Sequence, residues 1–125
     1  MKEVFSLIRI NKINKTKKAL AEAGIASFTA TGNVLGHGQG LVDFQIIHGA
    51  EEGHPEAIER LGDGIRLVPK RMLWVVVPDE QKDLVVKTII EANQTGEAGD
   101  GKVFVMPVLH AVRVRTGESG EEVLK

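Results

Sequence analysis

The chain has 125 residues, of which 42% are hydrophobic and 26% charged, and this length and composition favour a single domain over residues 1–125. A formal net charge of −1 gives the protein no general attraction to nucleic acid or to an acidic membrane surface. The absence of cysteine excludes disulfides and thiolate metal sites and favours the cytoplasm, and no apolar run reaches the ~20 residues of a membrane span.

The first part of the chain predicts a strand, a helix and a second strand. Residues 4–10 are apolar and rich in β-branched side chains, as strands are. Good helix formers occupy residues 15–23, between a candidate N-cap at Asn14 and a candidate C-terminal glycine at Gly24. Residues 25–34 predict the second strand.

The regular pattern ends at Gly36 and returns only near Val68. This stretch is rich in glycine and acidic residues, with one possible helical turn at 55–61. A connection of this length in a small domain is usually functional or disordered. We therefore expect a long effector loop over about residues 39–68, which binds a partner protein.

The second half of the chain predicts a strand at 72–77 and a helix that opens after Pro78 and ends near Gly96. Apolar residues on one stripe support that helix, and they are Val85, Val86, Ile89 and Ile90. Residues 102–108 and 111–115 predict two further strands. The expected fold is therefore an α+β, ferredoxin-like βαββαβ sandwich, with a long loop between strands 2 and 3 and a short extra C-terminal strand.

The strongest chemical motif is the glycine-rich segment that ends at Lys102. It contains Gly-x-x-x-x-Gly-Lys, the skeleton of a phosphate-binding P-loop, but Val103 replaces the hydroxyl residue that would hold Mg²⁺. The segment also follows a helix and enters a strand, which reverses the order of a P-loop. Glycine amides and a lysine can still bind phosphate. A flexible turn with a solvated lysine is an equally good interpretation of this segment alone.

Arg113 and Arg115 form a second candidate site. On a strand they would share one face, while Val112 and Val114 would face the core. Guanidinium groups suit partners with several oxygens, such as phosphate. Two ordinary surface arginines are the more common explanation of such a pair.

Three further positions follow or precede the irregular stretch. Gly36 and Gly38 would let a ligand approach the backbone closely, and Lys70 lies where the chain returns to regular structure. A mobile loop base explains the two glycines at least as well, and a solvated lysine is the more common explanation of Lys70. Trp74 is expected in the core.

These segments together resemble the nitrogen regulatory protein PII family. Residues 95–108 are similar to the C-terminal signature of the family almost word for word, and residues 112–118 continue it. Residues 19–25 and 75–79, together with Pro69-Lys70, are also similar. The resemblance covers nearly the whole chain except the long loop.

The resemblance implies a homotrimer that binds ATP or ADP in the clefts between subunits. By matching position, the implied nucleotide-binding residues are Leu7, Thr29, Gly36, Gly38, Val76, Gly99, Gly101, Lys102, Arg113 and Arg115. Gln39 would contact Mg²⁺ and 2-oxoglutarate, and Lys70 would meet a phosphate or the 2-oxoglutarate carboxylate. ATP and 2-oxoglutarate would share one Mg²⁺. The family is one of sensors, so no catalytic residue is implied.

The chain also departs from the family pattern. The stretch from Gly36 to Gln39 is one residue short, which affects the alignment of Gln39, and the absence of tyrosine excludes tyrosyl uridylylation and adenylylation. With its longer loop and its residues 67–73 and 92–96, the chain looks like the second nitrogenase-cluster PII paralogue of methanogenic archaea. That subgroup is implied to inhibit nitrogenase directly when ammonium is plentiful, alone or with a paralogous subunit.

Three alternatives remain at this stage. A general PII protein would act on glutamine synthetase or an ammonium transporter. A nucleotide-hydrolysing enzyme would need a general base and the P-loop hydroxyl, which are not apparent. A trimeric metal-tolerance protein of similar fold would not explain Lys102, Arg113 and Arg115 together.

Overall fold

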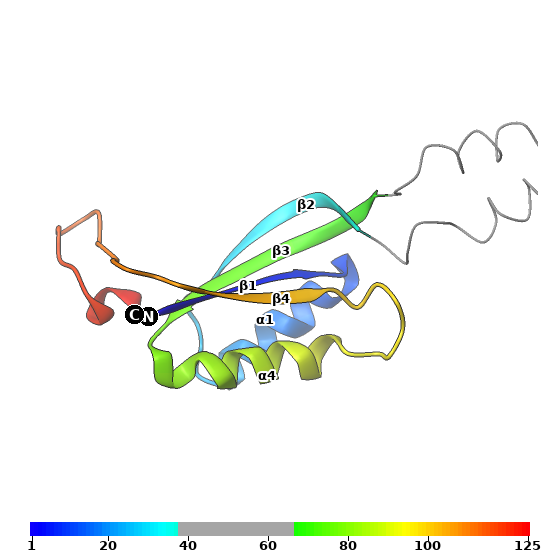
Figure 1. Ribbon diagram of the computed structural model, residues 1–125, viewed down its shortest axis with the longest axis horizontal. Helices are drawn as coiled ribbons and strands as arrows, with labels where there is room; N and C mark the ends of the chain where they lie inside the picture. Colours follow the sequence, from blue (N-terminus) through cyan, green and yellow to red (C-terminus); the bar gives the residue numbers. More distant parts are fainter. Residues whose placement is uncertain (38–66) are drawn as a thin grey trace, which may run out of the picture.

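The computed structural model describes residues 1–37 and 67–125, which form one antiparallel sheet with two helices on one face (Figure 1). The strands are β1 (Lys2–Ile8), β2 (Thr29–His37), β3 (Leu67–Val77) and β4 (Lys102–Pro107), in the spatial order β2-β3-β1-β4. The helices are α1 (Ile13–Glu22) and α4 (Lys82–Asn93). Each helix joins two strands that lie on either side of a third, which confirms the predicted ferredoxin-like fold.

The core lies between the sheet and the helices because alternate residues of the central strands are apolar. On β1 the buried positions are every second residue, and on β3 the same alternation continues. The buried side chains include Val4, Ile8, Leu73, Val75 and Val77 from the sheet, and Leu20, Val85 and Ile89 from the helices. Ser6 is also buried, and its hydroxyl donates to the Leu73 carbonyl at 3.1 Å. None of the described helices is long and apolar enough to cross a membrane.

A buried polar bridge joins the two helices. Asn93 Nδ2 donates to Thr16 Oγ1 at 2.9 Å and to the Ile89 carbonyl at 2.8 Å, and Thr16 Oγ1 donates to the Lys12 carbonyl at 2.7 Å. Both residues are buried, so each donor needs a partner within the protein. No donor within residues 1–37 and 67–125 bonds to the Oδ1 atom of Asn93.

The strands on either side of the long loop extend further toward it than the sequence suggests. β2 continues to His37, and β3 begins at Leu67 rather than residue 72, so that His37 pairs with Leu67 and Gly36 with Val68. A proline is normally excluded from a central strand, because it cannot donate a backbone hydrogen bond. The pairing of β3 with β1 ends at Arg71, so at Pro69 the strand β3 pairs with β2 on one side and has no β1 partner on the other. The possible turn at 55–61 lies outside the described residues.

Other predicted boundaries move by a few residues. β1 covers Lys2–Ile8 instead of residues 4–10, and β2 starts at Thr29 instead of residue 25. α1 begins at Ile13, and the residue at its N-cap is Lys12, whose side chain makes no capping hydrogen bond. The preference of Asn14 for a capping position is therefore overridden by the packing of Ile13 into the core.

The predicted extra C-terminal strand is wrong. Residues 111–115 contribute only one isolated bridge, between Val112 and Ser119. The chain turns back at once, because Gly117 adopts a φ of +73° and its amide donates to the Arg113 carbonyl at 2.8 Å. Val114 is fully exposed and does not face the core, so the alternation of valine and arginine reflects a turn.

The sheet face opposite the helices carries aromatic side chains. Phe5 of β1 lies between Trp74 of β3, at a ring-centroid distance of 6.2 Å, and Phe104 of β4, at 6.4 Å. Trp74 is therefore on the open face and not in the core as expected. Phe104 and Met106 are 46% and 40% exposed. An apolar face that no described helix covers is typical of a surface that binds another protein chain.

The Thr16–Asn93 bridge gives a test of the fold. Thr16→Val should lower the free energy of unfolding by about 1–2 kcal/mol, because it leaves a buried amide hydrogen without its acceptor. The double variant Thr16→Val/Asn93→Leu should recover most of that loss, because neither side chain then needs a partner. Chemical denaturation of the three proteins measures this, and a double variant less stable than Thr16→Val would contradict the bridge.

Candidate functional site

The connection from α4 to β4, here called the glycine loop (residues 95–101), is organised by the carboxylate of Asp100. Asp100 Oδ2 accepts hydrogen bonds from the backbone amides of Thr95 and Gly96, at 2.8 and 3.0 Å. Asp100 Oδ1 accepts from the Thr95 hydroxyl and from Arg9. These donors, of which the Thr95 hydroxyl and amide have the largest effect, hold the pKa of Asp100 well below its usual range.

Arg9 connects the glycine loop to the sheet. It is the first residue after β1, and its guanidinium pairs with Asp100 through Nη1 and donates to the Ala98 carbonyl through Nη2 at 3.0 Å. The side chains of Arg9 and Asp100 are each 23% exposed. Sequence reasoning missed both residues. The aspartate within the glycine motif is a local signal, but its arginine partner lies 91 residues away.

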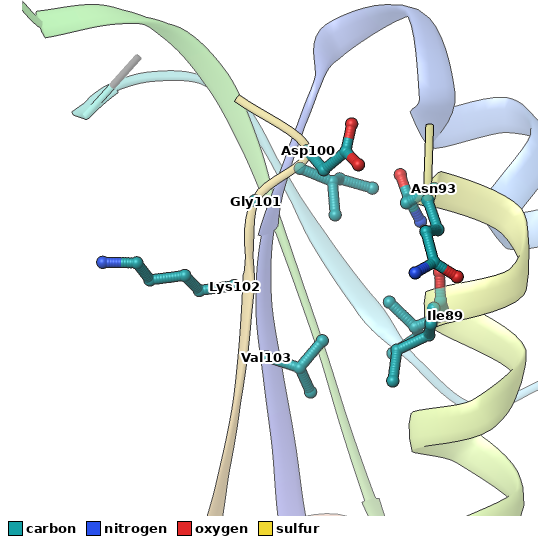
Figure 2. Close-up of a pocket in the computed structure, with 9 residues that line it drawn as sticks. Ile89, Asn93, Asp100, Gly101, Lys102 and Val103 are labelled. Carbon is teal, nitrogen blue, oxygen red and sulfur yellow. The ribbon is translucent and has the colours of Figure 1, made fainter. Parts of the chain in front are cut away.

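Gly101 places the loop directly against β1. Its φ is +108°, and a Cβ atom at this position would lie 2.0 Å from the carbonyl oxygen of Leu7. Only glycine allows this approach. Lys102 then pairs with Leu7 in the β1–β4 register, and the exposed lysine side chain projects away from the helices (Figure 2).

Lys70 of β3 approaches the same loop from the other side. It is only 4% exposed, and its ammonium donates to the Gly99 carbonyl at 2.7 Å. Gly36 of β2 lies over its stem, because a Cβ atom there would be 3.1 Å from Lys70 Cγ. Burial lowers the pKa of Lys70, the charge of Arg9 lowers it further, and Asp100 opposes the shift. Among the described residues, this buried cation thus has a neutral carbonyl group as its hydrogen-bond partner.

The remaining sequence-predicted nucleotide residues of the sheet lie on its open face. Leu7 pairs with Met72, Thr29 with Trp74 and Val76 with Glu3. Directly paired residues share a face, and these positions alternate with the buried ones on β1 and β3. The structure therefore brings Leu7, Gly36, Lys70, Gly99, Gly101 and Lys102 together at one end of the sheet, with Thr29 and Val76 further along it.

Arg113 and Arg115 are not brought to this end of the sheet. They belong to the segment after β4, which lies at the opposite end of the sheet from the glycine loop (Figure 1). They do not share a strand face, because the segment turns at this point. Arg113 instead pairs with Glu118 at 3.4 Å, and its Nη2 donates to the Glu122 carbonyl at 3.4 Å. Within one chain, these arginines do not reach Lys102.

Gly38, Gln39 and most of the predicted effector loop lie outside the described residues. The assignment of Gln39 to Mg²⁺ and 2-oxoglutarate therefore stays a prediction. Within residues 1–37 and 67–125, no group of three or more acidic or histidine side chains is arranged to hold a metal ion. The carboxylate of Asp100 is already occupied by its own donors.

A separate cleft of about 200 Å³ lies between the end of α4 and β4 (Figure 2). Ile8, Ile89 and Val103 give it apolar walls, and Asn93 and Asp100 also line it. Lys102 points away from this cleft toward the open face of the sheet. A ligand that contacts the Lys102 ammonium would therefore approach from the open face, with the glycine loop between it and the cleft.

Comparisons with known proteins identify relatives along the whole chain. The family model described as Nitrogen regulatory protein P-II matches residues 1–118. The chain is 46% identical over 129 residues to the "Nitrogen fixation nifHD region GlnB-like protein 2" of Methanobacterium ivanovii, with 99% of each chain covered. It is 40% identical over 122 residues to the "Nitrogen regulatory protein P-II 2" of Methanothermobacter thermautotrophicus, covering 98% of this chain and 96% of that one.

A solved structure is similar as well. It is described as Arabidopsis thaliana PII bound to citrate, and it matches with a TM-score of 0.72 at 33% sequence identity. The match covers 99% of this chain and 89% of the plant chain. Sequence and structure therefore agree on the same group of relatives.

The contact between Gly101 and Leu7 gives a test of the site. Gly101→Ala should lower the free energy of unfolding by more than about 2 kcal/mol, because it adds a backbone clash to the strain of a positive φ. Gly96→Ala is a matched control in the same loop, with a φ of +84° but nothing within 4 Å of the added methyl group. Thermal and chemical unfolding measure both variants. Equal losses of stability would show that the Leu7 contact is unimportant.

Proposed function

Because the chain belongs to the nitrogen regulatory protein P-II family, we propose that it senses ATP or ADP together with 2-oxoglutarate and transmits their levels to a target of nitrogen metabolism. Proteins of this family are regulators of nitrogen metabolism and not enzymes, which removes the nucleotide-hydrolysing alternative. The predicted subgroup is also confirmed, since methanogen relatives at 42–46% identity are second GlnB-like proteins of nifHD regions.

The buried ammonium of Lys70 is the observation that carries the proposal. A buried cation is costly unless an anion or several hydrogen bonds compensate it, and Lys70 donates to a carbonyl oxygen. A phosphate or carboxylate in its place would form a stronger, charge-assisted contact. The plant PII bound to citrate supports a carboxylate ligand in this family.

The nucleotide would lie on the open face at the glycine loop. Lys102 and the backbone amides near Gly99 and Gly101 would contact its phosphates, while Leu7 and Val76 would lie near the base. Gly36, Gly38 and Thr29 would complete the wall on the β2 side. This arrangement uses the close approach of Gly101 to β1, which places the backbone of the loop directly beside Leu7.

Mg²⁺ would be held mainly by oxygens of the ligands. The described residues supply no free cluster of carboxylates, and Mg²⁺ commonly binds phosphates with few protein ligands. Gln39 would add a protein ligand, and Lys70 would contact either the γ-phosphate or the 2-oxoglutarate carboxylate. When bound, the ion would join ATP and 2-oxoglutarate, which ADP does not allow.

The assembly would be a homotrimer, or a trimer in which a paralogous subunit replaces one of the copies. Two observations support it: the aromatic face that no described helix covers, and the separation of Arg113 and Arg115 from Lys102 within one chain. Packing the open faces together would bury the apolar side chains. A neighbouring subunit would then bring its two arginines to the phosphates beside Lys102.

The target would be nitrogenase, inhibited through the effector loop when ammonium is plentiful and released when 2-oxoglutarate binds. The nifHD-region names of several relatives support this target. The alternative is a general P-II protein that acts on glutamine synthetase or an ammonium transporter, and the relatives named simply nitrogen regulatory protein P-II favour it. Capture of partners from ammonium-fed cells, with and without 2-oxoglutarate, separates these targets. The protein would act in the cytoplasm.

Calorimetric titration tests the ligand proposal. ATP with Mg²⁺ should raise the affinity for 2-oxoglutarate, and 2-oxoglutarate should raise the affinity for ATP by the same factor, because linkage is reciprocal. ADP should not produce this enhancement. Lys70→Met, which keeps an apolar stem but removes the ammonium, should lose 2-oxoglutarate binding. Equal binding of 2-oxoglutarate with ATP, with ADP and without nucleotide would contradict the shared site.

Mixing defective subunits tests the proposed site between chains. Lys102→Ala and the double variant Arg113→Ala/Arg115→Ala should each bind ATP poorly, because each removes phosphate contacts from every site. A random 1:1 mixture of the two variants should regain about one quarter of the wild-type number of sites. About three quarters of its trimers contain both variants, and in each of these one of the three interfaces combines both intact halves. Calorimetric stoichiometry measures the recovery. A mixture that binds no better than its components would contradict a site shared between subunits.

A further inference from the structure

We propose that Arg9 and Asp100 are positioning residues for the anion site: they hold the glycine loop in place so that Lys70 can leave the loop and bind a ligand. This inference rests on the proposed function. Arg9 and Asp100 themselves would touch no ligand. Their role would be to keep the backbone at Gly99 and the side chain of Lys102 where the phosphates need them.

The glycine loop is held to the sheet at adjacent carbonyl groups by two different cations. Arg9 donates to the Ala98 carbonyl at 3.0 Å and pairs with Asp100, while Lys70 donates to the Gly99 carbonyl at 2.7 Å. Arg9 directly follows β1, and Lys70 belongs to β3. The loop therefore has one anchor on each of the two central strands.

The two anchors differ in what an arriving anion can take from them. Arg9 is already paired with a carboxylate, and the pair is mostly buried, so its charge is compensated within the protein. Lys70 has only the neutral Gly99 carbonyl among its described hydrogen-bond partners. A phosphate or carboxylate therefore gains more from Lys70 than from Arg9. Lys70 is the exchangeable anchor, and Arg9 is the permanent one.

The internal bonds of Asp100 explain why one permanent anchor is enough. The carboxylate of Asp100 is bonded to the amides of Thr95 and Gly96, so the two ends of the loop move as one unit. Arg9 attaches that unit to the sheet through the same carboxylate. Without Arg9, Lys70 would be the remaining side chain among the described residues that bonds the loop to the sheet, and the loop and the ligand would then compete for one ammonium group.

Nucleotide affinity of the full-length protein gives the test, with three variants and one control. Arg9→Ala removes the permanent anchor, Arg9→Lys keeps the charge, and Asp100→Asn breaks the ion pair while keeping an oxygen acceptor. The control is Lys2→Ala, which removes a surface ion pair between Lys2 and Asp79. Lys2 lies at the start of β1, at the end of the strand away from Arg9. Asp79 is 60% exposed, so this pair contributes little.

We expect Arg9→Ala and Asp100→Asn to weaken ATP binding by about tenfold or more, as the loss of a charge-assisted contact does. Arg9→Lys should recover most of the affinity, and Lys2→Ala should bind as the wild type does. The double variant Arg9→Ala/Asp100→Asn should be no weaker than the worse single variant, because both changes break the same link. Unfolding of each variant shows whether it is folded at the temperature of titration.

The amide resonances of the glycine loop distinguish a positioning role of Arg9 from a general loss of stability. In the ATP-saturated state, the amide resonances of Gly99 and Gly101 should shift or broaden in Arg9→Ala but return to their wild-type positions in Arg9→Lys. If Arg9→Ala does not fold, Asp100→Asn and Arg9→Lys carry the comparison. A folded Arg9→Ala or Asp100→Asn with wild-type ATP affinity would overturn this inference alone. A wild-type protein that binds no ATP would overturn the proposed function as well.

Discussion

Asp100, near the end of the glycine loop, accepts hydrogen bonds from the start of that loop and forms an ion pair with Arg9, and the rest of the site depends on this arrangement. A carboxylate with so many donors stays ionised, because its pKa is held well below the usual range. It fixes the loop that presents Gly101 to β1 and starts β4 at Lys102. The positions of the residues that would contact a phosphate therefore depend on an aspartate that would not contact the phosphate itself.

The two faces of the sheet have separate tasks. One face is covered by α1 and α4 and supplies the core, which leaves the helices no part in the proposed anion site. The other face carries Phe5, Trp74 and Phe104 beside Lys70 and Lys102, so apolar and cationic surfaces adjoin. An assembly through this face would bury the aromatic side chains and complete the site at once. Folding of the chain and completion of the site would then be different steps.

Most of the fold follows from local patterns in the sequence, whereas parts of the site do not. Apolar periodicity placed the strands and helices in the right order, and the Gly-Lys motif located the loop. Long-range contacts carry what the sequence did not reveal. Arg9 meets Asp100 across 91 residues, and Pro69 is accepted in a strand because β1 has already ended. The alternation of valine and arginine around Arg113 predicted a strand, but the turn at Gly117 prevents one.

An experimental structure of the ATP complex tests the central claim most directly. The account predicts that the phosphates contact Lys102 of one subunit and Arg113 of its neighbour on the open face of the sheet. It also predicts that Lys70 leaves the Gly99 carbonyl for an anionic group of a ligand while Arg9 stays paired with Asp100. A nucleotide bound by a single chain, or seated in the cleft beside Asn93, would contradict the account.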